Sequence, residues 1–138
     1  MTDIDRISGD VLDAAIRLHK ELGPGLLESV YETLLASSLA RRGYKVARQQ
    51  PVDIEFDGIR FQSAFRIDIL VEDMLLIEVK SVDRLHAAHA KQLLTYLRLS
   101  KQPVGLLINF SGATLKEGFK RLVNDYHSVP ERPLITLE

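Results

Sequence analysis

The 138-residue sequence contains no cysteine. The chain can therefore form no disulfide, no thiolate metal site and no cysteine nucleophile, and any metal must be held by oxygen or imidazole ligands, which favours magnesium or manganese. No apolar run approaches the length of a membrane span, and the N-terminal residues lack the basic start and apolar centre of a signal peptide. We therefore expect no membrane partner and a cytoplasmic location.

The chain also has almost no net charge, with a value of −1 at pH 7. This balance neither supports nor excludes nucleic acid as a partner, because a DNA-binding enzyme needs a local basic surface rather than a basic total. Two clusters of basic residues are candidate surfaces, and the alternative for each is a solvated face or a set of cations at a helix C-terminus. The clusters are Arg41, Arg42, Lys45 and Arg48, and Lys116, Lys120 and Arg121.

What remains is an ordinary composition, with 46% hydrophobic and 27% charged residues, and a length that suits one domain over residues 1–138. Apolar residues recur at helical spacing in some segments and alternate in others. The predicted helices are 3–22, 27–42, 85–101 and 115–125, and the predicted strands are 44–47, 52–56, 59–71, 75–80, 104–110 and 134–137. Because the strand after the third helix must rejoin the sheet, this order predicts an α/β fold with a mixed central sheet flanked by helices.

Two local signals refine this prediction. The second helix has a helically spaced stripe that includes Leu27, Tyr31 and Leu34, which we expect to face the core. Asp57-Gly58 is a strong two-residue hairpin signal between two of the strands.

The most informative stretch is residues 61–80, which reads as two strands folded back on each other. Alternation places Ile67 and Ile69 on one face of the first strand and Asp68 on the other. Asp68 and, on the second strand, Glu78 interrupt apolar runs, where charges are rarely found unless paired. If the reversal centres on Asp73, Asp68 lies directly across from Glu78, and the Cβ atoms of such partners are roughly 4.5–5.5 Å apart.

Two carboxylates this close can share a divalent cation, and the same register makes Lys80 and Arg66 the next pair. A carboxylate pair flanked by cations can hold a metal, orient a water and offset charge on a phosphate, as metal-assisted phosphodiester hydrolysis requires. Without a metal the two anions would repel, and one would take up a proton. The alternative is that these charges lie on a solvated strand face.

The order of elements, with Asp68 on one strand and Glu78-Val79-Lys80 on the next, resembles the PD-(D/E)XK nucleases. On the third helix, Gln92 to Tyr96 fits the QxxxY motif of the RecB-like branch, and Gly25 to Tyr31 fits the signature of the bacterial GxxExxY proteins. The resemblance spans nearly the entire sequence. It implies a restriction-endonuclease-like α-β-β-β-α-β core and a hydrolase that cleaves phosphodiester bonds of DNA with Mg²⁺ or Mn²⁺. The proline of the superfamily name is absent, but no ligand is lost.

The resemblance implies a role for each matching residue. Asp68 and Glu78 would hold the metal, with the Val79 backbone carbonyl as a third ligand. Lys80 would orient or help to deprotonate the attacking water and stabilise the transition state. Glu28 would complete the metal shell or a second ion site, although a glutamate in the first turn also favours the helix macrodipole.

On the substrate side, Gln92 and Tyr96 lie one turn apart on one helix face, so both can reach the same groove. The resemblance implies that Gln92 contacts the metal water or the substrate and that Tyr96 contacts a phosphate. Arg66 is a further candidate for substrate binding. We expect Tyr31 to pack in the core.

Other functions stay open. One is a catalytically inactive module of the same fold that binds nucleic acid or a partner, and another is an enzyme of small-molecule phosphate esters, which the absence of a P-loop weakens. A nuclease of this size would act on ends or single strands, form a homodimer, or depend on a partner protein for specificity. Exonuclease and endonuclease action, and DNA and RNA substrates, are open alternatives.

Overall fold

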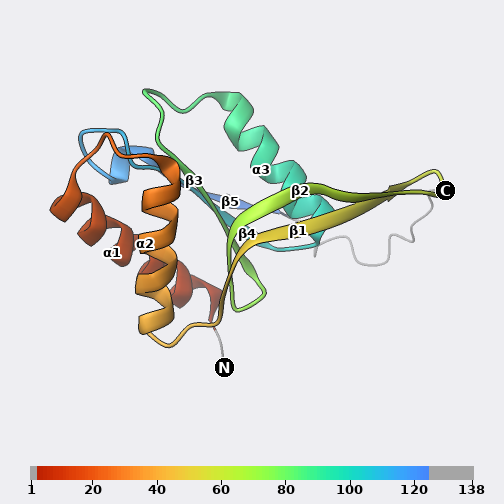
Figure 1. The fold of residues 1–138 in the computed structure, drawn as a ribbon, viewed down its shortest axis with the longest axis horizontal. Helices are drawn as coiled ribbons and strands as arrows, with labels where there is room; N and C mark the ends of the chain where they lie inside the picture. Colours follow the sequence, from red (N-terminus) through yellow and green to blue (C-terminus); the bar gives the residue numbers. More distant parts are fainter. Residues whose placement is uncertain (1–2, 125–138) are drawn as a thin grey trace.

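The computed structural model describes residues 3–124 (Figure 1). Its elements follow one another as α1 (Ile4–Leu22), α2 (Glu28–Arg41), β1 (Val46–Phe56), β2 (Ile59–Val71), β3 (Leu75–Lys80), α3 (Ala87–Ser100), β4 (Val104–Asn109), the short 3₁₀ helix η1 (Lys116–Gly118) and β5 (Phe119–Val123). In this part of the chain, every helix is too short or too polar to cross a membrane. The predicted order is confirmed as far as β4.

The five strands form one sheet in the order β1-β2-β3-β4-β5. Strands β3 and β4 are parallel, and the other neighbouring strands are antiparallel. The connection from β3 to β4 passes through α3, because parallel neighbours need a long crossover. The predicted α/β fold with a mixed central sheet is confirmed.

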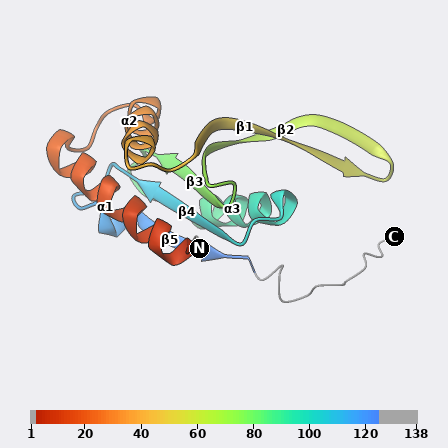
Figure 2. The ribbon, with the colours of Figure 1, turned by 90° about the horizontal axis from the view of Figure 1, so that it is seen from below.

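Helices cover both faces of the sheet (Figures 1 and 2). The face under α1 and α2 has the larger apolar cluster, to which α1 contributes Ile7 and Val11 and α2 contributes Leu35 and Leu39. The face under α3 has a smaller cluster, formed by Ile67, Leu70, Leu76, Leu93, Leu97 and Leu107. The sheet is therefore buried on both sides over β3 and β4, and the whole of β4 is buried.

Helix α2 buries a different stripe from the one that apolar spacing predicts. Tyr31 and Leu35 are buried as expected, but Leu27 is 72% exposed and Leu34 is 40% exposed. Leu27 is the N-cap residue, with an extended backbone (φ −69°, ψ 150°), and so precedes the first helical turn. The buried stripe instead includes Glu32, which is 6% exposed and which apolar periodicity does not detect.

Strands β1 and β2 form a long hairpin that extends beyond the rest of the sheet (Figure 2). Asp57 and Gly58 at its turn have φ values of 56° and 77°, as a two-residue turn with two left-handed residues requires, so the predicted hairpin is confirmed. The expected gap between residues 47 and 52 is wrong, because β1 is continuous. Pro51 is tolerated within β1 because β1 is an edge strand.

The predicted helix over residues 115–125 is wrong. Between residues 115 and 124 only η1 is helical, and Phe119–Val123 forms β5, which pairs with β4 in antiparallel register. Leu122 packs against the α3 cluster and Phe119 against the α1–α2 cluster, so neighbouring parts of this segment serve opposite faces of the sheet. The strand predicted over residues 134–137 lies outside the described residues.

Candidate active site

The site lies where β2 separates from β3. The ladder between these strands pairs Ile69 with Ile77 and ends there, in the register that centres on Asp73. At the next position of the two strands, hydrogen bonds to side chains take the place of backbone pairing. The Asp68 amide donates to Glu78 Oε2 at 3.3 Å, and the Val79 amide donates to Asp68 Oδ2 at 2.9 Å. The two carboxylates are therefore brought together, as the expected register requires.

The alternation of β2 breaks at Asp68. Ile69 packs in the α1–α2 cluster and Leu70 in the α3 cluster, as alternate positions should, but Ile67 also packs in the α3 cluster. The expectation that Ile67 and Ile69 share a face is wrong. The break lies beside Gln49 of β1, which the β1–β2 register skips and whose φ of 50° is in the left-handed region. At this irregularity the β2–β3 ladder has already ended, so Asp68 and Glu78 are linked through their side chains rather than by backbone pairing.

The two carboxylates are electrostatically unfavourable when both are charged. Glu78 is only 6% exposed. Burial, together with the neighbouring Asp68 charge, raises the pKa of Glu78 to about 8. Burial also raises the pKa of Asp68, against the opposing effect of the hydrogen bond from Val79. The pair therefore favours one bound proton near neutral pH, and a cation could take the place of that proton.

Lys80 and Tyr96 lie within electrostatic reach of this pair. The Lys80 charge lowers the pKa of both Asp68 and Glu78. Burial, then the Glu78 and Asp68 charges, raise the pKa of the Tyr96 phenol, whose ring stacks on Phe65 of β2 with centroids 4.0 Å apart. The residue predicted one turn before it, Gln92, is exposed on α3.

Two other predicted residues have different surroundings. Glu28 Oε2 accepts a hydrogen bond from the Ser81 amide at 3.1 Å, so this carboxylate is tied to the end of β3. No group of three or more histidine, aspartate or glutamate side chains among residues 3–124 is arranged to hold a metal. Arg66 is exposed and pairs with Pro51 of β1, so the expected pair of Arg66 with Lys80 does not form, because the β2–β3 ladder has already ended.

The structure adds two residues that sequence reasoning missed, Glu32 and Gln49. The Gln49 amide nitrogen lies 3.0 Å from both Glu32 carboxylate oxygens and 3.3 Å from Asp68 Oδ1. Arg48 donates to Glu32 Oε2 at 3.1 Å. The Glu32 charge in turn raises the pKa of Asp68 and of Glu78. Neither residue gave a sequence signal, because Glu32 lies outside the apolar stripe predicted for the second helix and Gln49 lies in the predicted gap between two strands.

Tyr31 has a structural role, as expected. It is fully buried and stacks on Phe110 with ring centroids 4.5 Å apart. Its hydroxyl donates to the Gly23 carbonyl at 2.5 Å and accepts from the Leu26 amide at 3.1 Å. Tyr31 therefore holds the turn that precedes α2 and, with it, the start of the helix that carries Glu28.

The predicted basic clusters are neutralised in part by ion pairs. Arg42 pairs with Asp13 at 3.0 Å, Lys45 with Asp73 at 2.7 Å, and Arg48 with Glu32. In the second cluster, Arg121 pairs with Asp5 at 2.6 Å. These residues mainly link elements within the protein.

The fold and this pair of strands agree with a comparison against known families. The family model of the PD-(D/E)XK nuclease superfamily matches residues 5–122, so the chain belongs to that superfamily. Its members are generally nucleases, which indicates hydrolase activity and a nucleic-acid substrate, and the mixed sheet with flanking helices suits their restriction-endonuclease-like fold. No curated protein and no solved structure matches the chain.

Proposed function

We propose that the protein is a Mg²⁺- or Mn²⁺-dependent nuclease that hydrolyses phosphodiester bonds of DNA. The observation that carries this proposal is the buried pair formed by Asp68 and Glu78, whose pKa values are raised by burial. Two adjacent carboxylates in a mostly apolar sheet are unfavourable unless a proton or a cation lies between them. Oxygen donors of this kind suit a hard divalent cation.

In this proposal Asp68 and Glu78 hold the ion, with the Val79 carbonyl as a third donor. The bound ion supplies Lewis acidity and lowers the pKa of a coordinated water. The Lys80 ammonium offsets negative charge that develops on the phosphate. Gln92 and Tyr96 contact the substrate from α3. Glu28 holds the end of β3 through Ser81 and so orients Lys80, which directly precedes Ser81.

Glu32 and Gln49 act as positioning residues in the same proposal. Gln49 donates to Glu32 and to Asp68, and thereby fixes the orientation of the Asp68 carboxylate. Such supporting hydrogen bonds commonly change metal affinity or activity by about 10–100-fold when they are removed. The left-handed φ of Gln49 fits this role, because backbone strain concentrates at functional sites.

The experiment is a nuclease assay on single-stranded, double-stranded and branched DNA, with Mg²⁺ or Mn²⁺ compared with EDTA. Glu78→Ala and Lys80→Ala should abolish hydrolysis while circular dichroism and thermal unfolding show a folded protein. RNA of the same sequences tests the choice of DNA.

Cleavage that persists in EDTA would contradict the proposed metal dependence. If the folded protein binds DNA but cleaves no substrate at high enzyme concentration, the inactive binding module becomes the better description. Hydrolysis of small phosphate esters alone would favour the third alternative.

A further inference from the structure

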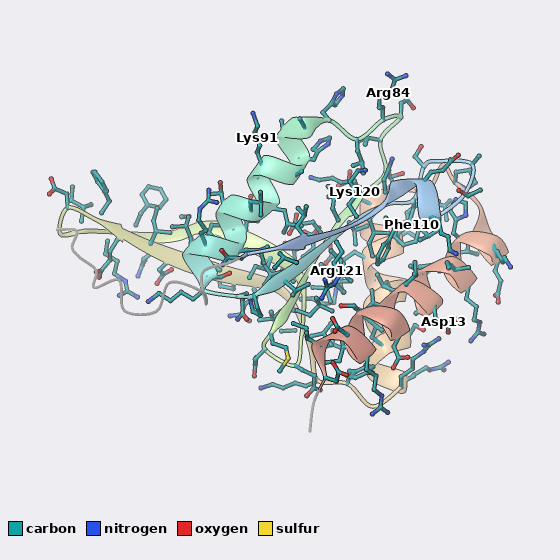
Figure 3. The ribbon with its side chains drawn as sticks, turned by 180° about the vertical axis from the view of Figure 1, so that it is seen from behind. Asp13, Arg84, Lys91, Phe110, Lys120 and Arg121 are labelled. Atoms are coloured by element: carbon teal, nitrogen blue, oxygen red, sulfur yellow. The ribbon has the colours of Figure 1, made fainter. Side chains whose placement is uncertain are left out.

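A long part of the chain that includes α3 contains no acidic residue. Between Arg84 and Lys116 there is no aspartate and no glutamate. Arg84, in the loop before α3, and Lys91 and Arg98, on α3, are all exposed. Figure 3 shows the Arg84 and Lys91 side chains pointing outward on the α3 side of the molecule. We call these three residues the α3 cation row.

The α3 cation row takes no part in the ion pairs among residues 3–124. The ion pairs among residues 3–124 involve α1, the end of α2, the β1–β2 hairpin, the β2–β3 turn and β5. None of them involves a residue of the acid-free segment or Arg84. The charges of the α3 cation row are therefore free to attract an external anion, whereas those of Arg42 or Arg60 are locally compensated.

Helix α3 carries both Tyr96, whose phenol is near the carboxylate pair, and two residues of the row. Leu93 and Leu97 are buried beneath the helix. Tyr96 is half-buried and lies close enough to the carboxylate pair for their charges to raise its pKa. Lys91 and Arg98 are seven residues apart and so lie on one helix face, away from the buried leucines. At a rise of 1.5 Å per residue they are separated by about 10 Å along the helix axis, which corresponds to about three phosphates of one strand along a duplex.

We propose that the α3 cation row binds the phosphate backbone of a nucleic acid and leads the strand along α3 to the carboxylate pair. This inference rests on the proposed function for the identity of the polyanion. Arg84 and Arg98 can each form two parallel hydrogen bonds to a phosphate, and Lys91 acts as a point charge. Contacts of this kind position a strand without reading its sequence.

The test is fluorescence anisotropy of labelled single-stranded and duplex oligonucleotides, measured in EDTA so that no turnover occurs, over a series of salt concentrations. The variant is Arg84→Ala/Lys91→Ala/Arg98→Ala. The matched control is Arg6→Ala/Lys20→Ala/Arg41→Ala, which removes three exposed cations from α1 and α2, on the other face of the sheet. Alanine is a good helix former, so both variants should fold.

The row variant should bind every sequence more weakly. Each lost phosphate contact lowers the steepness of log K against log salt by about 0.9 for duplex or about 0.7 for single strands, so three contacts change it by about 2–3. The control should leave this slope close to that of the unmodified protein. DNA and RNA arms show which backbone binds more tightly.

Equal slopes for the row variant and the unmodified protein, an equal loss in the control, or no nucleic-acid binding at all would overturn the proposal. Row-dependent binding to anionic lipid vesicles but not to oligonucleotides would also overturn it. Because these measurements need no hydrolysis, a protein that binds through the row but never cleaves would contradict the proposed nuclease and leave the row standing. If the row variant retains full cleavage and an unchanged slope, the proposed nuclease stands and the role of the α3 cation row is contradicted.

Discussion

The two faces of the sheet differ in how their charges and polar groups are satisfied. On the α1–α2 side, several cations pair with acids, as in Arg121 with Asp5 at 2.6 Å, and the Tyr31 hydroxyl makes two hydrogen bonds. On the α3 side, Lys91 and Arg98 have no acidic neighbour in an ion pair among the described residues. The carboxylates of Asp68 and Glu78, at the point where β2 leaves β3, are likewise poorly compensated.

This difference separates the α1–α2 side, with its larger apolar cluster, from the side on which we propose the active site. The α1–α2 side has the larger apolar cluster and several ion pairs, whereas the buried carboxylate pair on the other side breaks the local rules of charge pairing. Sequences that specify one fold tend to break such rules at functional positions. The comparison can be tested by substitutions that should affect activity on one side and stability on the other.

The largest expected effect is on activity, from Asp68→Asn. Loss of one carboxylate removes several kcal/mol of metal-dependent stabilisation of the transition state, which corresponds to a decrease of about 10³-fold or more in kcat/KM. Asp73→Asn, in the exposed turn of the same hairpin, is the control and should retain activity. Steady-state kinetics with Mg²⁺ measures both, and equal effects would contradict a special role for Asp68.

The next effect is on stability, from Leu39→Ala. Leu39 is fully buried in the α1–α2 cluster, so truncation should lower the free energy of unfolding by about 2–5 kcal/mol through lost burial and a cavity. Activity per folded molecule should stay the same. Leu93→Ala, in the α3 cluster, should lower stability and activity together, because α3 also carries Tyr96. Denaturant unfolding and steady-state kinetics measure both variants. A loss of activity in Leu39→Ala as large as that in Leu93→Ala would contradict the difference between the two faces.

A smaller effect is expected from Gln49→Ala, which removes the bridge between Glu32 and Asp68. Activity and Mn²⁺ affinity, the latter measured by calorimetry, should fall by about 10–100-fold. The neighbouring Gln50→Ala should leave both unchanged. Gln49→Gly should be more stable than Gln49→Ala, because glycine adopts a φ of 50° without strain. A Gln49→Ala protein with full Mn²⁺ affinity would argue against a positioning role.

A further expected effect is a pH dependence of stability without metal. Burial and Asp68 raise the pKa of Glu78 from 4.5 to about 8, so between these values the folded protein binds a proton that the unfolded chain has released. The contribution of Glu78 to stability is therefore favourable at pH 5 and is lost as the pH rises through 8. Thermal unfolding in EDTA should show Tm falling over this range, and Mg²⁺ should reduce the fall. In Glu78→Gln the dependence of Tm on pH should be weaker. An unchanged dependence would mean that other titratable groups cause it.

The elements whose signals are local could be predicted from the amino-acid sequence. The Asp57-Gly58 turn, the reversal centred on Asp73 and the convergence of Asp68 and Glu78 follow from turn chemistry and strand register over short distances along the chain. The order of helices and strands up to β4 follows from hydrophobic periodicity in the same way. The superfamily match over residues 5–122 agrees with what those local patterns predicted.

The surroundings of the carboxylate pair could not be predicted in this way, because they depend on how distant segments pack. Gln49 and Glu32 are far apart along the chain and meet Asp68 because α2 packs beside the base of the β1–β2 hairpin. Likewise, Phe119–Val123 is a strand rather than a helix because β4 offers an unpaired edge. Contacts between distant segments depend on how whole elements pack, so the apolar spacing within one segment does not predict them.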